Sequence, residues 1–145
     1  MKRKQIMWIY RTGGFTLIEI MIAIFILTVA ILGLAAVTTT TIKGNSFSKA
    51  MTTATTLVND KLQDLKARTF TSSSVDADLS GAVSPGVTHT DTGNPIESIY
   101  NRSWTVVDTL GSGSSIRYKT ITVTVSWTWL GLSHSVQLQT IRARD

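Results

Sequence analysis

The longest uncharged segment of this chain constrains its fold more than any other feature. Between Ile20 and Ile42 there are 23 residues without a charged side chain. As a helix that rises about 1.5 Å per residue, the segment would be roughly 35 Å long, which is enough to cross a bilayer. A basic cluster lies on its N-terminal side, so the positive-inside rule places residues 1–14 in the cytoplasm and the chain after Ile42 outside it.

The composition limits what the remaining chain can be. A length of 145 residues predicts one domain with an added membrane segment. The formal charge of +5 is mostly a property of the leader, because ten basic and nine acidic residues remain after four basic ones are removed (Lys2, Arg3, Lys4 and Arg11). The chain has no cysteine, which excludes disulfides, thiol nucleophiles and cysteine-ligated zinc. No metal site or cofactor is predicted.

Two glycines stand before the apolar segment rather than after it. A secretory signal has its small-residue cleavage site behind the apolar core, so a cut at Gly13-Gly14 would discard only residues 1–14 and keep the hydrophobic helix. On the glycine pair alone, an uncleaved signal anchor remains an equal alternative.

The residues that follow carry a more specific pattern. The stretch GFTLIE, residues 14–19, runs into IMIAIFIL and closely resembles the processing signal of type IV prepilins and of type II secretion pseudopilins. The resemblance implies cleavage after Gly14 by a membrane aspartyl peptidase, the prepilin peptidase, followed by N-methylation of Phe15 and an assembly role for Glu19. Many major pilins carry a proline later in the apolar segment. None is present here, which favours a minor pilin or a pseudopilin.

Glu19 needs a physical explanation, because an ionisable group in a membrane helix is costly and usually marks function. Cleavage after Gly14 would create a cationic amine at Phe15, about one helical turn away in the same subunit or on a neighbouring one. The family resemblance favours the neighbour. Glu19 would then be an assembly register, a contact that fixes how one subunit's helix is staggered against the next. The alternative is a carboxylate that is favoured by the helix dipole and rests among lipid head groups.

The remaining chain predicts an α+β, pilin-like fold, in which a long N-terminal helix packs on a small C-terminal antiparallel sheet. Residues 15–42 form the transmembrane and assembly helix, and residues 43–68 continue it as an amphipathic helix. A loop region that has room for a short strand follows at 69–103, and alternating apolar residues predict an antiparallel sheet at 104–145. The predicted apolar stripe of the helix is Phe47, Met51, Ala54, Val58, Leu62 and Leu65.

The sheet shows a second, weaker resemblance. In the segment 117–129, Trp127 and Trp129 continue an apolar face that starts at Ile121, which favours core positions over a stacking surface for ligands. The paired tryptophans, a glycine, His134 and the strand after it are similar to the C-terminal sheet of PilV-like minor pilins.

No catalytic site is predicted. His89 and His134 are the only histidines, and neither has a carboxylate set at ligand or triad spacing nearby. Asp76 and Asp78 could form a calcium ligand pair, but a solvated loop is the favoured interpretation. The sequence therefore indicates a structural protein and not an enzyme.

The predicted function is that of a minor type IV pilin in a priming or tip complex. Its expected partners are other pilins through the N-terminal helix, the prepilin peptidase, the inner-membrane assembly platform and, before assembly, membrane lipid. The first alternative is a minor pseudopilin of a type II secretion system. The second is a DNA-uptake pilin, with Arg142 and Arg144 as a weak basic patch, although the nearly neutral mature chain makes nucleic acid an unexpected partner. The expected location is the bacterial inner membrane and then a pilus or pseudopilus.

Overall fold

The computed structural model describes residues 13–71 and 74–144, so most of the predicted leader lies outside the described residues. Helix α1 runs from Leu17 to Ala67 without interruption. The chain divides into two compact units, Met1–Lys43 and Gly44–Asp145. The first contains the apolar part of α1, and the second contains the end of α1 and the whole sheet.

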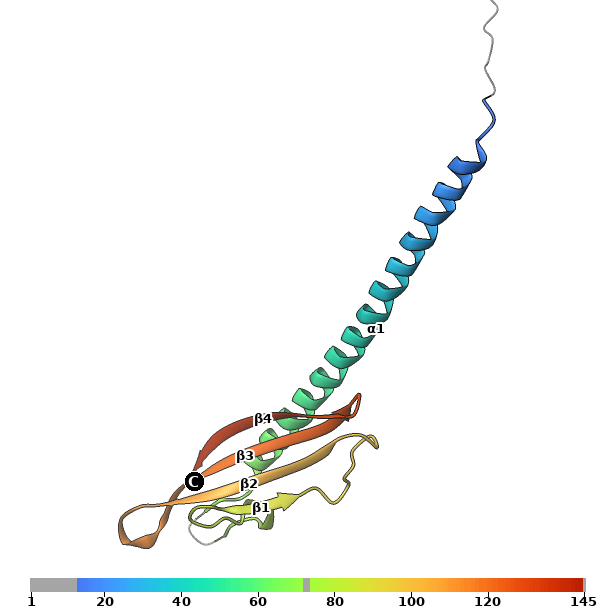
Figure 1. Ribbon diagram of the computed structural model, residues 1–145. Coiled ribbons are helices and arrows are strands. Elements are labelled where there is room, and N and C mark those ends of the chain that lie inside the picture. The colour runs from blue at the N-terminus through green and yellow to red at the C-terminus, as the bar shows by residue number, and fades with distance from the viewer. Residues whose placement is uncertain (1–12, 72–73, 145) are drawn as a thin grey trace, which may run out of the picture. The chain divides into compact units, whose positions relative to one another are not determined.

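The sheet of the second unit is a four-stranded antiparallel meander in the order β1-β2-β3-β4 (Figure 1). Its strands are Val87–Thr90, Asn101–Leu110, Ile116–Trp129 and Leu132–Ala143. Short 3-10 turns, η1 at Ala77–Leu79 and η2 at Ser112–Ser114, precede β1 and join β2 to β3. The predicted α+β fold class is confirmed, and β1 is a short strand within the predicted loop region, where the sequence allowed one.

One face of the sheet and one face of α1 form the core. Burial alternates from Lys119 to Trp127 of β3, as the period of two residues predicts for a strand with one covered face. The helix contributes residues spaced by three and four positions, as its own period requires. The buried apolar side chains are Ala54, Val58, Leu62, Leu65, Phe70, Leu79, Tyr100, Trp104, Val106, Ile121, Val123, Val125 and Trp127.

Two positions of the helix differ from the predicted stripe. Met51 is half exposed, although the spacing placed it in the stripe, while Ala50 packs against the core instead. Lys61, a charged residue outside the predicted stripe, is buried. The covered surface drifts around the helix, from Ala50 near one end to Leu62 near the other, because a twisted sheet does not contact a straight helix along one line of residues.

Candidate processing and assembly site

Helix α1 begins where Thr16 caps it. The backbone N–H of Glu19 donates to Thr16 Oγ1 at 3.3 Å and to the Thr16 carbonyl at 3.1 Å. Thr16 and Glu19 occupy the N-cap and N3 positions of a capping-box pattern, in which the carboxylate also favours the positive end of the helix dipole. The helix therefore starts at Leu17, and Gly13, Gly14 and Phe15 remain outside it.

The chain itself does not require glycine at the predicted cleavage position. Gly14 is exposed, and a Cβ added there would meet no atom within 4 Å. The same holds for Gly13. A small residue at Gly14 consequently has no packing role among the described residues, so a requirement for glycine would come from an enzyme that binds this segment.

Phe15 and Glu19 lie on the same side of the chain. Both line a shallow groove whose other residues are Ile20, Ala23, Ile24 and Leu27. Glu19, Ala23 and Leu27 are spaced by one helical turn, so the groove runs along one face of α1. Glu19 is the only charged residue between Phe15 and Ile42, and Lys43 lies about 36 Å further along an α-helix. The structure thus presents one carboxylate on an otherwise apolar surface.

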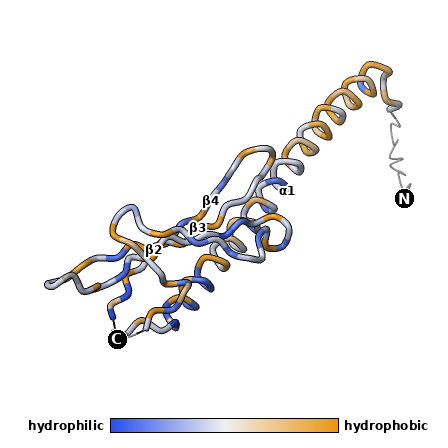
Figure 2. Tube along the Cα trace, turned by 90° about the horizontal axis from the view of Figure 1, so that it is seen from below, coloured by the Kyte–Doolittle hydropathy of each residue, from blue (hydrophilic) through white to orange (hydrophobic). Residues whose placement is uncertain are grey.

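The N-terminal part of α1 is apolar on all sides, as Figure 2 shows by its hydrophobic colouring. Large side chains from Phe15 to Ile42 are each about half exposed or more. Four consecutive threonines, Thr38–Thr41, donate their hydroxyls to carbonyls four residues back, at 2.8–3.1 Å. Those hydroxyls are satisfied without water. By length and composition α1 is able to cross a membrane.

The acidic pair in the predicted loop belongs to an ion-pair network. Asp76 caps η1 and accepts from Arg68 at 3.2 Å, while Asp78 lies 3.2 Å from Arg68 and 3.4 Å from Lys61. Asp64 joins both cations, and the hydrogen bond from Arg68 lowers its pKa below the usual 3.8. Asp76 and Asp78 are partly exposed, and the end of α1 also brings two cations beside them, which the sequence did not indicate.

The other residues considered as candidate sites have structural partners. His89 stacks on Trp104 at 5.4 Å between ring centroids, and its Nε2 lies 2.8 Å from the Ser80 carbonyl. His134 stacks on Trp127, at 5.7 Å between ring centroids. Trp127 is a core residue, as predicted. Within residues 13–71 and 74–144 no group of three or more metal-ligating side chains comes together.

Sequence reasoning missed two buried lysines. Lys61 Nζ lies 3.9 Å from the centroid of the Trp104 ring, and Lys119 forms a buried ion pair with Asp108. Lys119 stands at a core-facing position of β3, between Arg117 and Ile121 in the alternating pattern. Asp108 of β2 lies opposite Lys119 of β3, and this pairing could be predicted only if the strand register were known.

Comparison with known protein families supports the motif at the start of α1. Residues 10–35 match the prokaryotic N-terminal methylation motif. Comparisons with curated proteins and with solved structures gave no match. The motif implies processing by a prepilin peptidase and assembly with other pilins, and it is typical of structural subunits. Together with the membrane-length helix that it overlaps and the α+β fold, the motif supports a type IV pilin-like protein, the precursor of a pilin or pseudopilin.

Proposed function

We propose that the protein is a minor type IV pilin. In this proposal the precursor is held in the inner membrane by residues 15–42, cleaved after Gly14, methylated on the Phe15 amine and then transferred into a pilus. The isolated carboxylate of Glu19, which lines one groove with Phe15 on the apolar part of α1, is the observation that carries the proposal. The lack of proline in α1 supports a minor subunit over a major one.

The leader sets the topology. Its basic residues hold residues 1–14 in the cytoplasm, and the second unit, Gly44–Asp145, lies on the opposite side of the membrane. The described part of the predicted cleavage site, Gly13–Thr16, is exposed and non-helical, as a peptide that enters a protease site should be. Subunits wait in the bilayer until the assembly platform extracts them.

Glu19 supplies the register of assembly. A carboxylate in apolar surroundings is costly unless a cation pairs with it, and the mature Phe15 amine of an adjacent subunit is such a cation. Coulomb attraction at a given distance is several-fold larger in a protein environment than in water, so one stagger between neighbouring helices is favoured over all others.

The test is Glu19→Ala in cells that make wild-type partner pilins. Membrane insertion and cleavage should persist, because the apolar segment and Gly14 are unchanged, while recovery of the processed protein with partner pilins should fall at least tenfold at matched expression. Sheared fibres and membranes are analysed separately by mass spectrometry. Peptides of the protein in surface fibres support a pilus, whereas their confinement to the cell envelope supports the type II secretion pseudopilus.

Glu19→Gln is the matched control for the capping role. Glutamine at N3 serves a capping box as well as glutamate does, but it carries no charge. If the charge sets the register, both variants lose assembly. If assembly survives in Glu19→Gln, the side chain acts by capping the helix and the register proposal is wrong.

A further inference from the structure

The hairpin between β3 and β4 ends in an unusual turn. Leu130 and Gly131 are its two central residues, and both have positive φ, at +50° and +79°. Turns of this kind favour Asn-Gly or Asp-Gly, because a residue with a larger side chain is disfavoured at positive φ. Leu130 is also 70% exposed. An apolar side chain thus occupies a position that both the backbone and water disfavour.

Other apolar side chains surround this tip. Leu132, which pairs with Trp129 across the hairpin, is 67% exposed. Trp129 is partly buried against Phe47, at 6.4 Å between ring centroids, and lines a groove that also contains Ile99 and two charged residues, Lys49 and Glu97. Ile99 is 53% exposed. We call Trp129, Leu130, Leu132 and Ile99 the apolar tip.

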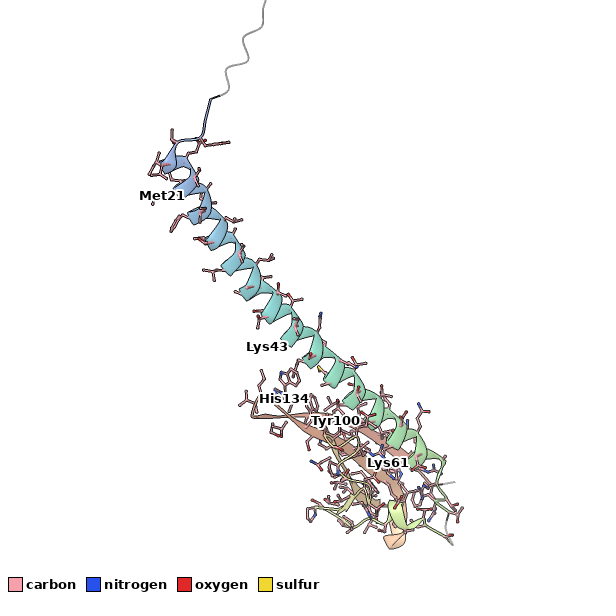
Figure 3. All side chains as sticks on the ribbon, turned by 90° about the vertical axis from the view of Figure 1, so that its right-hand side faces the viewer. Met21, Lys43, Lys61, Tyr100 and His134 are labelled. Atoms are coloured by element: carbon pink, nitrogen blue, oxygen red, sulfur yellow. The ribbon has the colours of Figure 1, made fainter. Side chains whose placement is uncertain are left out.

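The apolar tip lies at the end of the second unit where the chain leaves the membrane segment. Phe47, which contacts Trp129, follows Ile42 by only five residues, and five residues span at most about 18 Å in any conformation. Figure 3 shows His134 beside this end of α1 within the unit, with Tyr100 and then Lys61 further along. The charged network of Lys61 and Arg68 therefore occupies the other end of the unit.

We propose that the apolar tip inserts into the head-group region of the bilayer that holds residues 20–42, so that the globular unit rests on the membrane before assembly. Tryptophan and leucine suit this region, where an amphipathic ring and an apolar side chain leave bulk water, and the Lys49 side chain can reach anionic lipid head groups. The proposal rests on membrane anchoring through α1 and not on the choice between a pilus and a pseudopilus.

The test uses the full processed chain in vesicles of phosphatidylethanolamine and phosphatidylglycerol. Because the chain has no cysteine, Leu130→Cys introduces a single thiol for an environment-sensitive fluorophore. Ser112→Cys, exposed in η2 at the opposite end of the β-meander, is the matched control with the same dye. Ala35→Cys reports on insertion of the helix itself. Quenching is measured with nitroxide-labelled lipid and with aqueous iodide.

The expected result is at least threefold stronger lipid quenching at position 130 than at position 112, with the opposite order for iodide. Equal quenching at the two positions, with the Ala35→Cys label quenched by lipid, would show that the tip stands in water and would overturn the proposal. Protection of position 130 that appears only when a partner pilin is added would also overturn it and would assign the tip to a protein interface. Failure of lipid to quench the Ala35→Cys label would refute the anchoring on which the proposal rests.

A second pair of variants excludes an effect of the dye. With the fluorophore at Leu132→Cys, Leu130→Asn should reduce lipid quenching about twofold while it places a preferred residue in the turn. Leu110→Asn, at an exposed apolar position at the far end of β2, should leave the quenching unchanged. If the two asparagine variants behave alike, Leu130 makes no contact with lipid.

Discussion

Lys119 and Asp108 show how a single pair of residues is stabilised inside the sheet. Lys119 is 1% exposed, and its Nζ donates to Asp108 Oδ1 at 2.5 Å from the adjacent strand. The ring of Phe70 lies 5.1 Å from the same Nζ. A Cβ at Gly81 would come within 2.4 Å of Asp108 Oδ1, so glycine leaves the room that the carboxylate occupies. The pair is buried because each charge has a partner.

Removing one partner of this pair should be strongly destabilising. Lys119→Ala would leave Asp108 buried and unpaired, and we expect a loss of about 3–5 kcal/mol in the free energy of unfolding. Denaturant titration of the full chain in detergent, followed by tryptophan fluorescence, measures it. The double variant Lys119→Met with Asp108→Leu should be near neutral. A single variant as stable as wild type would show that the carboxylate finds water or another partner.

Gly14 allows a second prediction at the scale of one residue. Because Gly14 contacts nothing within the described chain, Gly14→Val should leave the fold and membrane insertion unchanged but should abolish processing. Intact-mass analysis of membrane protein would then show the precursor, whereas wild type should show residues 15–145 with one methyl group. Gly13→Val, at an equally open position, is the control. Normal cleavage of Gly14→Val would contradict the proposed processing site.

Among the elements, strand β2, the loop after β1 and helix α1 are joined by one charged side chain. Arg102 on β2 donates to Asp91 through Nε at 2.7 Å and to the Leu57 carbonyl of α1 at 3.2 Å. Burial raises the pKa of Asp91, but the hydrogen bond and charge of Arg102 outweigh it and hold that pKa below 3.8. Strand, loop and helix are therefore linked by one guanidinium.

This linkage predicts acid sensitivity. Because the pKa of Asp91 is lower in the folded chain than in the unfolded one, its stabilisation is complete above about pH 4 and is lost as the pH falls through the folded value. The free energy of unfolding, measured between pH 5 and pH 2, should fall less steeply in Asp91→Asn. In an Arg102→Gln background, Asp91→Asn should no longer alter the slope. If Asp91→Asn alone leaves the pH dependence of the unfolding free energy unchanged, Asp91 does not contribute to acid sensitivity.

At the scale of the whole molecule, the two units differ in where their apolar side chains lie. Residues 13–43 expose apolar side chains on every face of the helix, whereas the core residues of the second unit come from α1, the loops and the sheet together. The part of α1 after Lys43 therefore belongs energetically to the sheet. Without it, the apolar face of β2 and β3 would be an exposed patch of the kind that drives aggregation.

This division predicts the behaviour of two fragments. A fragment of residues 43–145 should be soluble and folded, because it contains every buried core residue. A fragment of residues 69–145 should aggregate, because Trp127 loses its contact with Phe47 and the buried face of β3 loses the core residues of α1. Size-exclusion chromatography and far-ultraviolet circular dichroism distinguish the two. Equal solubility would mean that α1 does not complete the core.

The local signals in the sequence were sufficient for much of the fold. The uncharged segment predicted the apolar part of α1, and the alternation from Ile121 to Trp127 predicted the covered face of β3. The carboxylate of Glu19 could also be recognised, since a lone charge in an apolar segment stands out without any tertiary contact. The sequence by itself thus determined the helix, the strand faces and the candidate processing and assembly residues, because each depends on neighbours within a few positions.

Only the tertiary structure decided which polar residues are buried and which apolar ones remain exposed. Lys61 is covered because Trp104 and Asp78 reach it from distant parts of the chain, while Met51 stays half exposed and its neighbour Ala50 packs against the core. The conformation and exposure of Leu130 likewise emerge only once β3 and β4 pair in register. Such outcomes depend on which segments meet across long sequence separations, and the period of a single segment does not contain that information.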